Sequence, residues 1–302
     1  MSEPKVAAIV LNYNGRDVTL QTLASLRQMT YGNFGLIVVD NGSTDGSYQA
    51  VAEAFPDVVQ VRTEKNLWAA GGANLGMRYV LERDYDYILM LNNDIEVEPA
   101  MLTELMKVAE SDPSIGCVGP KAYYYWDRQR LWSAGGIIRF KESGSRERGK
   151  GEIDRGQYNR DEQVDYINGC AMLVPRRVMV EVGGWDPIYH LALEDVDWCL
   201  RMKRLGYCCV YAHRAVLWHM VSHTAGGYEA RRTFQTGRSL AILVRRFGGS
   251  WQWCTFALFV AAALPLAYLR ELPKRNQSAV VAKLRGVIDG LRARVTPPPK
   301  LT

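Results

Sequence analysis

The sequence lacks the short motifs that identify several large classes of enzyme. It has no H-E-x-x-H pair, no cysteine and histidine spacing typical of a zinc site, no G-x-S-x-G elbow and no G-x-x-x-x-G-K-[ST] loop. A G-x-G-x-x-G loop is also missing after the first predicted strand. These absences disfavour zinc hydrolases, α/β-type serine hydrolases, P-loop nucleotidases and dinucleotide-binding oxidoreductases.

C-x-x-C cysteine pairs are missing as well, and we expect no leader segment. None of the six cysteines forms a C-x-x-C pair, so we expect free, mostly buried thiols in a reducing compartment. Residues 2–5 lead straight into a predicted strand, and we expect no secretory signal. The net charge is only +5, but basic residues gather after Arg201. This distribution predicts an anionic partner such as phosphate groups or a membrane surface, and we expect no nucleic acid.

One long stretch, residues 247–269, carries no charge. It is long enough to span a bilayer. Its tryptophans and basic flanks also suit a helix that lies in the membrane interface. We favour peripheral or monotopic attachment at the cytoplasmic side of the cell membrane over a true span or a buried soluble helix. Residues 226–302 are thus predicted to be a helical, basic, membrane-associating region that ends in a disordered tail, "TPPPKLT".

Strand and helix patterns alternate over the first hundred residues. Strands are predicted within 5–11, 35–39, 58–61 and 88–91, and helices within 17–27, 47–55, 71–83 and 99–110. Strands that are apolar throughout and separated by helices indicate an α/β fold, with a mostly parallel sheet and helices on both faces. The binding crevice of such a sheet lies at the carboxyl ends of its strands.

The second half of the chain mixes the two patterns. Strands are predicted at 116–120, 164–175 and 208–212, and helices at 176–182 and 194–205. Residues 139–163 are highly charged, and we expect a mobile loop there. Residues 1–225 are predicted to form one catalytic domain.

Two of the predicted strands end in polar residues. Asp40 follows the second strand, where a carboxylate can accept the ring N–H of a pyrimidine, although an ordinary Asx turn explains it equally well. Asn93 and Asp94 follow the fourth strand. A carboxylate beside an amide oxygen suits Mg²⁺ or Mn²⁺ with a nucleotide diphosphate, and a polar turn is the alternative.

A glycine-rich helix start and an acidic helix start complete the candidates. Gly71 and Gly72 would let a diphosphate approach backbone N–H groups, and close packing explains them as often. Glu194 and Asp195 open a helix whose dipole stabilises acids, and either one can serve as a general base. Within that helix we expect Asp197 to pair with Arg201.

Histidines follow the last predicted strand. His219 comes directly after an apolar run and His223 lies four residues further on. His219 could complete a metal site or bind a phosphate. An ordinary core or surface histidine is the alternative.

Taken together and in their order along the chain, these motifs resemble those of family 2 glycosyltransferases of the GT-A type, in particular the bacterial rhamnosyltransferase-like branch. The matching stretches, which lie between residues 5 and 225, are "AIVLNYNGRD", "LIVVDNGSTDGS", "KNLWAAGGANLGMRY", "YILMLNNDIEVEP", "VGPK", "VDYINGCAMLVPRRVMVEVGGWDP", "LALEDVDWCLRMKRLGY" and "AVLWHMVSH". The resemblance implies an inverting transferase that uses Mg²⁺ or Mn²⁺ and a UDP- or dTDP-sugar, for instance dTDP-rhamnose. The implied acceptor is a hydroxyl of a glycan or polyprenyl-linked sugar in cell-surface polysaccharide synthesis.

The resemblance also implies roles for single residues. Asp40 matches the acid that reads the nucleobase, and Asp94 matches the metal carboxylate of the D-x-D motif, written here Asn92-Asn93-Asp94. Asp195 matches the catalytic base, with Glu194 beside it, and His219 matches a histidine near the metal and diphosphate. The other expected donor-binding residues are Asn12, Asn14, Asn66, Gly71, Gly72, Asn74 and Asn93.

Two stretches depart from the branch pattern. After Asn66 the branch commonly runs x-Gly-Phe-Ala-Gly-Gly-Asn-Asn, whereas here Trp68 and Ala73 replace a glycine and an asparagine. Residues 190–193 carry no ring but that of His190, where the family often has aromatics. These departures keep open a catalytically inactive nucleotide-sugar-binding protein with the same fold. A sugar-nucleotide pyrophosphorylase is disfavoured, since its basic, glycine-rich signature is missing after the first strand, and a homo-oligomer stays open.

Overall fold

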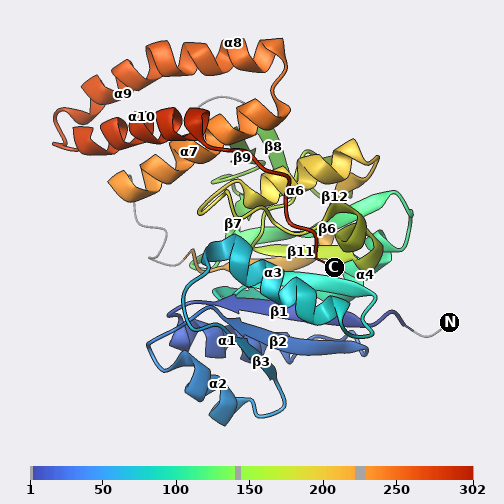
Figure 1. The fold of residues 1–302 in the computed structure, drawn as a ribbon. Coiled ribbons are helices and arrows are strands. Elements are labelled where there is room, and N and C mark those ends of the chain that lie inside the picture. Colours follow the sequence, from blue (N-terminus) through green and yellow to red (C-terminus); the bar gives the residue numbers. More distant parts are fainter. Residues whose placement is uncertain (1–2, 140–143, 222–228, 302) are drawn as a thin grey trace.

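The computed structural model describes residues 3–139, 144–221 and 229–301, and a ten-stranded mixed sheet forms its centre (Figure 1). The order across the sheet is β10-β12-β6-β11-β4-β1-β2-β3, with β5 beside β12 and β7 beside β6. These strands are β1 (Val6–Asn12), β2 (Phe34–Asp40), β3 (Val59–Arg62), β4 (Tyr87–Asn92), β5 (Ile95–Val97), β6 (Ile115–Tyr124), β7 (Asp127–Ser133), β10 (Glu162–Val164), β11 (Ala171–Pro175) and β12 (Cys208–His219). A separate two-stranded sheet pairs β8 (Gly136–Arg139) with β9 (Gly144–Glu147).

Helices cover both faces of the sheet. They are α1 (Arg16–Leu26), α2 (Ser47–Ala54), α3 (Trp68–Leu81), α4 (Met101–Ala109), α5 (Arg176–Val182), α6 (Glu194–Arg204), α7 (Ala230–Phe247), α8 (Ser250–Leu258), the π-helix η2 (Phe259–Ala263), α9 (Leu264–Glu271) and α10 (Gln277–Arg292). Alternate residues of β1 enter two different cores, because successive strand side chains point to opposite faces. Ile9 packs in the core with residues of α3, α6 and α7, and Val10 packs in the other core with residues of α1 and α4.

The predicted parallel arrangement is confirmed for the first half of the chain. β1 runs parallel to both β2 and β4, and β2 runs parallel to β3. Asn12 is in register with Asp40, and Leu11 is in register with Asn92. The polar residues that end these strands therefore share one edge of the sheet. β11 runs antiparallel to β4, which the sequence did not indicate.

The expectation of a mobile loop over residues 139–163 is wrong for its described part. That stretch contains β9, whose Gly144–Glu147 backbone pairs with β8, and the start of β10. Several of its charged side chains form ion pairs, for example Asp154 with Lys121 at 2.9 Å. The strand predicted at 164–175 is two strands with a turn between them, and the strand predicted at 208–212 continues to His219.

The tail predicted to be disordered is folded back onto the molecule in its described residues, 296–301. Leu301 is buried, and the Pro299 carbonyl accepts a hydrogen bond of 3.0 Å from the Gly184 N–H. A side chain at Gly183 would place its Cβ 2.7 Å from the same carbonyl oxygen. The tail thus packs against the turn that precedes Trp185.

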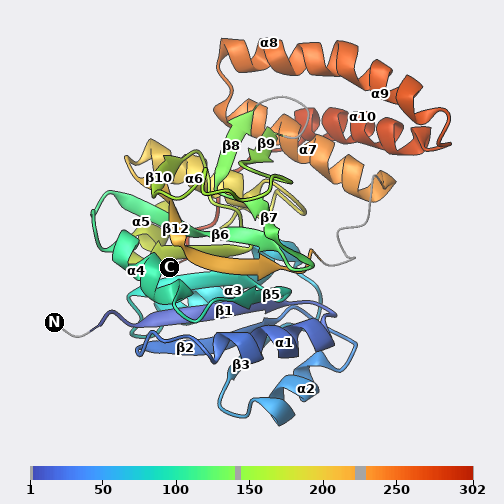
Figure 2. The same cartoon turned by 180° about the vertical axis from the view of Figure 1, so that it is seen from behind.

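The C-terminal helices form a layer beside the sheet, with α8 and α9 outermost (Figures 1 and 2). α7 is anchored in the main core through residues 240–244, and α10 packs along it. At the end of α7, Arg246 forms ion pairs of 2.6 Å with Asp186 and with Asp197, all nearly fully buried. Asp197 also pairs with Arg201 at 2.8 Å, as predicted. The proposed domain boundary at 225/226 and His223 lie outside the described residues.

Candidate functional site

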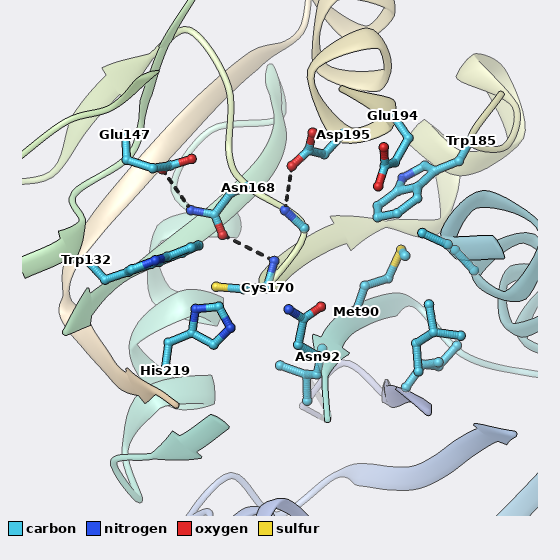
Figure 3. A pocket seen from close by; sticks show the side chains of 16 residues that line it. Met90, Asn92, Trp132, Glu147, Asn168, Cys170, Trp185, Glu194, Asp195 and His219 are labelled. Atoms are coloured by element: carbon cyan, nitrogen blue, oxygen red, sulfur yellow. Dashed lines mark hydrogen bonds between the residues drawn. The ribbon is translucent and has the colours of Figure 1, made fainter. Parts of the chain in front are cut away.

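A cavity of about 270 Å³ lies at the carboxyl ends of β1 and β4, beside the start of α6 (Figure 3). Its apolar lining comes from β1, α3 and β4 and comprises Ile9, Leu11, Ala69, Ala73, Met90 and Leu91. Its polar and aromatic lining comprises Asn92, Trp132, Glu147, Asn168, Trp185, Glu194, Asp195 and His219. Figure 3 shows Glu147 and Asn168 on one side of Asp195, and Glu194 and Trp185 on the other. The sheet edge predicted from the sequence therefore carries a partly open cavity that has polar side chains in its lining.

Asp195 and Glu194 are brought to the cavity by the first turn of α6. Asp195 Oδ2 accepts the Gly169 N–H at 2.8 Å and Oδ1 accepts the Val196 N–H at 2.8 Å. Glu194 Oε2 is buried and has no hydrogen-bond partner among the described residues. The residue before α6, Leu193, has φ 71°, and Ala192 has φ 79°. Two successive non-glycine residues in the left-handed region are strained, and such strain is typical of functional sites.

Burial governs the protonation of the two carboxyl groups. It raises the pKa of Glu194 to about 8, and the neighbouring Asp195 charge adds to that rise. Burial also raises the pKa of Asp195 to about 7, against the Gly169 N–H, which stabilises its carboxylate form. Asp195 is therefore the more acidic of the two. A carboxyl group whose pKa lies near neutrality is well suited to accept a proton and release it again.

Asp94 and His219 meet where β5 pairs with the end of β12. His219 Nε2 lies 3.1 Å from Asp94 Oδ1, and both side chains are buried. The His219 ring also packs edge-on against Trp132 at 4.3 Å between centroids. Its Nδ1 is buried without a hydrogen-bond partner in the described part of the chain. A carboxylate in contact with an imidazole is a pair of groups that can bind a divalent metal ion, and Asn92 lines the same cavity as His219.

The amides of Asn12 and Asn93 point away from the cavity. Asn12 Oδ1 accepts bonds from Asn93 Nδ2 at 2.9 Å and from Thr19 Oγ1 at 2.9 Å. Asn12 Nδ2 in turn lies 3.3 Å from Asp40 Oδ2. Within the Asn92-Asn93-Asp94 motif it is Asn92, not Asn93, whose residue lines the cavity. Asn12 and Asn93 therefore join β1, α1 and β4 behind the site.

Asp40 is fully buried outside the cavity. Its carboxylate accepts the Ser43 N–H at 3.0 Å and lies 3.4 Å from the Arg62 guanidinium. The side-chain oxygen of Asn14 accepts a hydrogen bond of 2.8 Å from the Thr44 N–H. Both contacts hold the loop that follows β2. The predicted nucleobase contact of Asp40 stays a prediction.

The remaining predicted donor-binding residues shape α3 and its neighbours. Asn66 Oδ1 accepts the Trp68 N–H at 2.7 Å. Gly71 and Gly72 lie inside α3 rather than at its start, and a Cβ on Gly72 would come within 2.6 Å of Leu11 Cδ1. Asn74 binds the main-chain N–H and carbonyl of Trp185, each at 2.8 Å. In this structure these residues set the position of α3 and of the Trp185 wall.

Several cavity residues were not predicted from the sequence. Asn168 and Trp185 lie inside stretches that carried the family resemblance, so the motifs contained a signal for them. Glu147 was hidden in the charged stretch, and Trp132 carried no local signal. Pairing of β7, β8 and β9 brings these last two to the cavity, and such pairing cannot be read from residue spacing.

Trp68 occupies a position that favours glycine. Its φ is 61°, which L side chains rarely adopt. The indole stacks on the His190 ring at 5.6 Å and 19°, and the Arg231 guanidinium lies 5.1 Å from its centroid. These contacts link α3, the segment before α6, and α7 at the rim of the cavity. The glycine of the branch pattern is thus explained by backbone conformation, and Trp68 keeps that conformation under strain.

Comparison with known sequences places the site in a family context. A family model described as "Glycosyl transferase family 2" matches residues 7–183. The chain is 27% identical over 265 residues to an N-acetylglucosaminyl-diphospho-decaprenol L-rhamnosyltransferase of Mycobacterium tuberculosis, covering 76% of this chain and 81% of that protein. It is 24% identical over 252 residues to a poly-beta-1,6-N-acetyl-D-glucosamine synthase of Staphylococcus aureus, covering 82% of this chain and 58% of the synthase.

Solved structures share the fold at low sequence identity. The mannosyltransferase PcManGT of Pyrobaculum calidifontis, in complex with GDP-Man and Mn²⁺, has a TM-score of 0.59 at 17% identity, over 96% of this chain and 88% of that chain. GalNAc-T7 with UDP, GalNAc and Mn²⁺ has a TM-score of 0.68 at 13% identity, over 98% of this chain and 59% of that chain. At these identities the likeness concerns the fold.

Strain at Trp68 predicts an unusual order of stability. Trp68→Ala and Trp68→Gly both lose the ring contacts, but only glycine adopts φ 61° without a steric cost. We expect the glycine variant to be more stable by about 1 kcal/mol, measured by urea unfolding. The same pair of substitutions at Trp126, which is exposed and has no positive φ, should show no advantage for glycine. Equal stability of the two Trp68 variants would contradict the strain.

The raised pKa values of Glu194 and Asp195 predict a pH-dependent stability. Unfolded carboxyl groups titrate near pH 4, so their contribution to stability is complete below about pH 4 and is lost as the pH rises through 7 to 8. Glu194→Gln removes one of these groups, and the fall in the free energy of unfolding between pH 5 and pH 9 should shrink by a few kcal/mol. The exposed Glu53→Gln serves as the control. An unchanged pH profile in Glu194→Gln would show that its carboxyl is not held protonated.

Proposed function

The chain belongs to glycosyl transferase family 2 and has the GT-A fold, and from this premise we propose that it is a metal-dependent inverting glycosyltransferase of cell-surface polysaccharide synthesis. The observation that carries the proposal is the shared cavity of Asp195 and His219, the latter in contact with Asp94. These residues come from α6, β12 and the β4–β5 connection, far apart in the sequence. Their convergence on one partly open cavity supports a single site for an activated sugar and an attacking hydroxyl.

Asp195 is the proposed general base. Its pKa near 7 leaves a large fraction ionised at neutral pH, and its carboxylate lines the cavity. The acceptor hydroxyl gives its proton to Asp195 and its oxygen attacks the anomeric carbon, while the bond to the nucleotide diphosphate breaks on the opposite face. One displacement inverts the configuration and needs one base. Glu194, the weaker acid, would stay protonated beside it and limit the negative charge in the cavity.

Asp94 and His219 would hold the divalent ion, with Asn92 beside them. A bound ion supplies positive charge that stabilises the leaving diphosphate. Imidazole nitrogen is a ligand that Mg²⁺ seldom takes, so this donor set favours Mn²⁺ over Mg²⁺. Both structural neighbours described above contain Mn²⁺.

The donor and acceptor classes are proposed from the relatives and the cavity lining. The mycobacterial relative is named as a rhamnosyltransferase that acts on a polyprenyl-linked N-acetylglucosamine. Rhamnose carries a methyl group in place of a hydroxymethyl group. The apolar lining from Ile9, Leu11 and Met90 suits such a methyl group better than a hydroxyl. We therefore propose a dTDP- or UDP-linked sugar, with dTDP-rhamnose first, and a polyprenyl-linked glycan as acceptor.

A membrane surface is the proposed place of action. The helix from Ser250 to Glu271 is long and apolar enough to cross a membrane, yet only 17% of its most apolar window is buried in the protein. Trp251, Leu258 and Leu266 are each more than 60% exposed, whereas Phe256 and Phe259 pack inward. One face on protein and one apolar face outward favour a helix that lies in the interface over one that spans.

The basic flanks expected to meet lipid contribute less than their charge suggests. Arg245 donates hydrogen bonds to the carbonyls of Gly290 and Ala293, and Arg246 is engaged in buried ion pairs with Asp186 and Asp197. At the other end of the helix, Arg270 and Lys274 both pair with Glu271. The apolar side chains of α8 and α9 would therefore supply most of the membrane affinity.

Removing the proposed base should abolish transfer without removing donor binding. Asp195→Asn should lower the turnover number by roughly 10²- to 10⁴-fold, because the amide cannot accept the proton. Nucleoside diphosphate release is measured with Mn²⁺, a panel of dTDP- and UDP-sugars, and a polyprenyl-diphosphate N-acetylglucosamine acceptor; nucleotide affinity is measured by calorimetry. Asp57→Asn, on an exposed loop, is the control. Unchanged turnover in Asp195→Asn would remove the base assignment, and donor binding without turnover in the wild type would favour the inactive binding protein.

The exposed face of α8 and α9 should carry membrane binding. Leu258→Asp with Leu266→Asp places two charges on that face, and we expect at least a tenfold loss of sedimentation with phosphatidylglycerol-containing vesicles. Val180→Asp, at an apolar residue of α5 that is exposed to a similar degree, should bind vesicles like the wild type. Vesicle binding that survives the double substitution would exclude this face as the attachment site.

A further inference from the structure

The wall formed by Trp132, Glu147 and Asn168 is assigned no role in the mechanism above. The three residues line the same cavity as Asp195 (Figure 3). They come from β7, from β9 and from the connection between β10 and β11. Resting on the proposed function, we propose that this wall is the acceptor subsite and that it selects an electrically neutral sugar over an acidic one.

Glu147 is fixed by hydrogen bonds, and one of its oxygens can still accept a further hydrogen bond. Its Oε2 accepts bonds from Ser133 Oγ at 2.5 Å and from Asn168 Nδ2 at 3.1 Å, while its Oε1 accepts one bond, from Tyr166 Oη at 2.7 Å. A carboxylate oxygen can accept two bonds, so Oε1 has capacity for a further hydroxyl. A carboxylate fixed by three donors binds a sugar hydroxyl with little loss of side-chain entropy.

Asn168 is likewise oriented by its surroundings. Its Nδ2 donates to Ser133 Oγ and to Glu147, and its Oδ1 accepts the Cys170 N–H at 3.2 Å. Both amide hydrogens are thus engaged, whereas the carbonyl oxygen has a second lone pair. The two side chains therefore offer acceptors rather than donors. Such a surface matches a ligand that presents hydroxyl groups.

Trp132 adds an aromatic surface next to these acceptors. One side of its ring environment is occupied by His219 and another by Lys150, whose ammonium lies 5.9 Å from the ring centroid. The residue nevertheless lines the cavity. An indole beside fixed hydroxyl acceptors is suited to the apolar C–H face and the polar edge of a pyranose.

Charge decides which substrate this wall can take. A diphosphate would be repelled by the Glu147 carboxylate, whereas a divalent ion held by Asp94 and His219 would attract it, so the donor phosphates belong on the Asp94 and His219 side. The hydroxyl of the acceptor sugar must reach Asp195. The Asp195 carboxylate accepts the N–H of Gly169, the residue that follows Asn168, so it lies close to this wall. An acceptor sugar that carries a carboxylate of its own would face Glu147 at close range and be disfavoured, whereas a neutral hexose or N-acetylhexosamine would not.

Binding of two synthetic glycosides separates this proposal from the proposed function. Octyl N-acetylglucosaminide is the neutral probe and octyl glucuronide the acidic one, each titrated into the full chain with Mn²⁺ and UDP present. The wild type should bind the neutral probe at least tenfold more tightly. Glu147→Gln should weaken binding of the neutral probe about tenfold and reduce the difference in affinity between the neutral and acidic probes. Trp132→Ala should weaken binding of the neutral probe by a similar factor. The affinity of Trp132→Phe should lie between those of the wild type and Trp132→Ala.

Controls on the same hairpin make the outcome decisive. Trp126, 83% exposed between β6 and β7, should tolerate Trp126→Ala without change in probe affinity. Nucleotide affinity should be the same in all variants, which shows that each is folded; if Glu147→Gln fails to fold, Trp132→Phe carries the test. Equal affinities of wild type and folded Glu147→Gln for the neutral probe would overturn the subsite. A wild type that binds the neutral probe more tightly than the acidic one but releases no nucleoside diphosphate from any donor would overturn the proposed function, and the wall would then be a binding site for neutral glycosides.

Discussion

Burial of two adjacent carboxyl groups at the start of α6 is the constraint around which the rest of the structure is arranged. Glu194 and Asp195 sit in a low-dielectric cavity, and ionisation there is opposed by desolvation. The α6 N-terminus and the Gly169 N–H partly offset that cost. The pair is nevertheless buried, because the walls of the cavity surround it. Its perturbed acidity is also what makes proton transfer near neutral pH chemically reasonable.

The walls are held by groups that bind protein rather than substrate. The turn at residues 183–186 forms hydrogen bonds with Asn74 of α3, with Trp198 and Arg201 of α6 and with Pro299 of the tail. Arg246 then ties α7 to both Asp186 and Asp197. Burying these ions is expensive unless each is paired, which each is. Because α8 and α9 follow α7, the proposed membrane face is joined through α7 to the residues that support the cavity.

Three of the strained residues lie near the rim of the same cavity. Trp68, Ala192 and Leu193 all have positive φ without being glycine. Stacking of Trp68 on His190 joins two of these strained segments, and the cation of Arg231 adds a third element. Each such residue costs free energy that the surrounding packing must supply. Their concentration beside Glu194 and Asp195 separates this rim from the ordinary turns of the fold.

The sequence alone determined the alternation of strands and helices, the parallel first half and the strand ends where polar residues collect. These features depend on local periodicity and on residues next to one another in the chain, such as the apolar run before Asn92 or the acids that open α6. The motif order predicted that Asp40, Asp94, Asp195 and His219 meet at one crevice. In the structure Asp195 and His219 line one cavity and His219 contacts Asp94, whereas Asp40 is buried outside that cavity.

Tertiary structure decided which of these residues face the cavity. Asn92 rather than Asn93 does so, because strand residues alternate and Asn93 is drawn to Asn12. It also brought Glu147 and Trp132 to the site and folded the tail against Gly184, since strand pairing and long-range contacts leave no local pattern. The local sequence around a residue determines its secondary structure far more than it determines which distant residues that residue contacts. Those tertiary contacts determine the chemistry of the cavity.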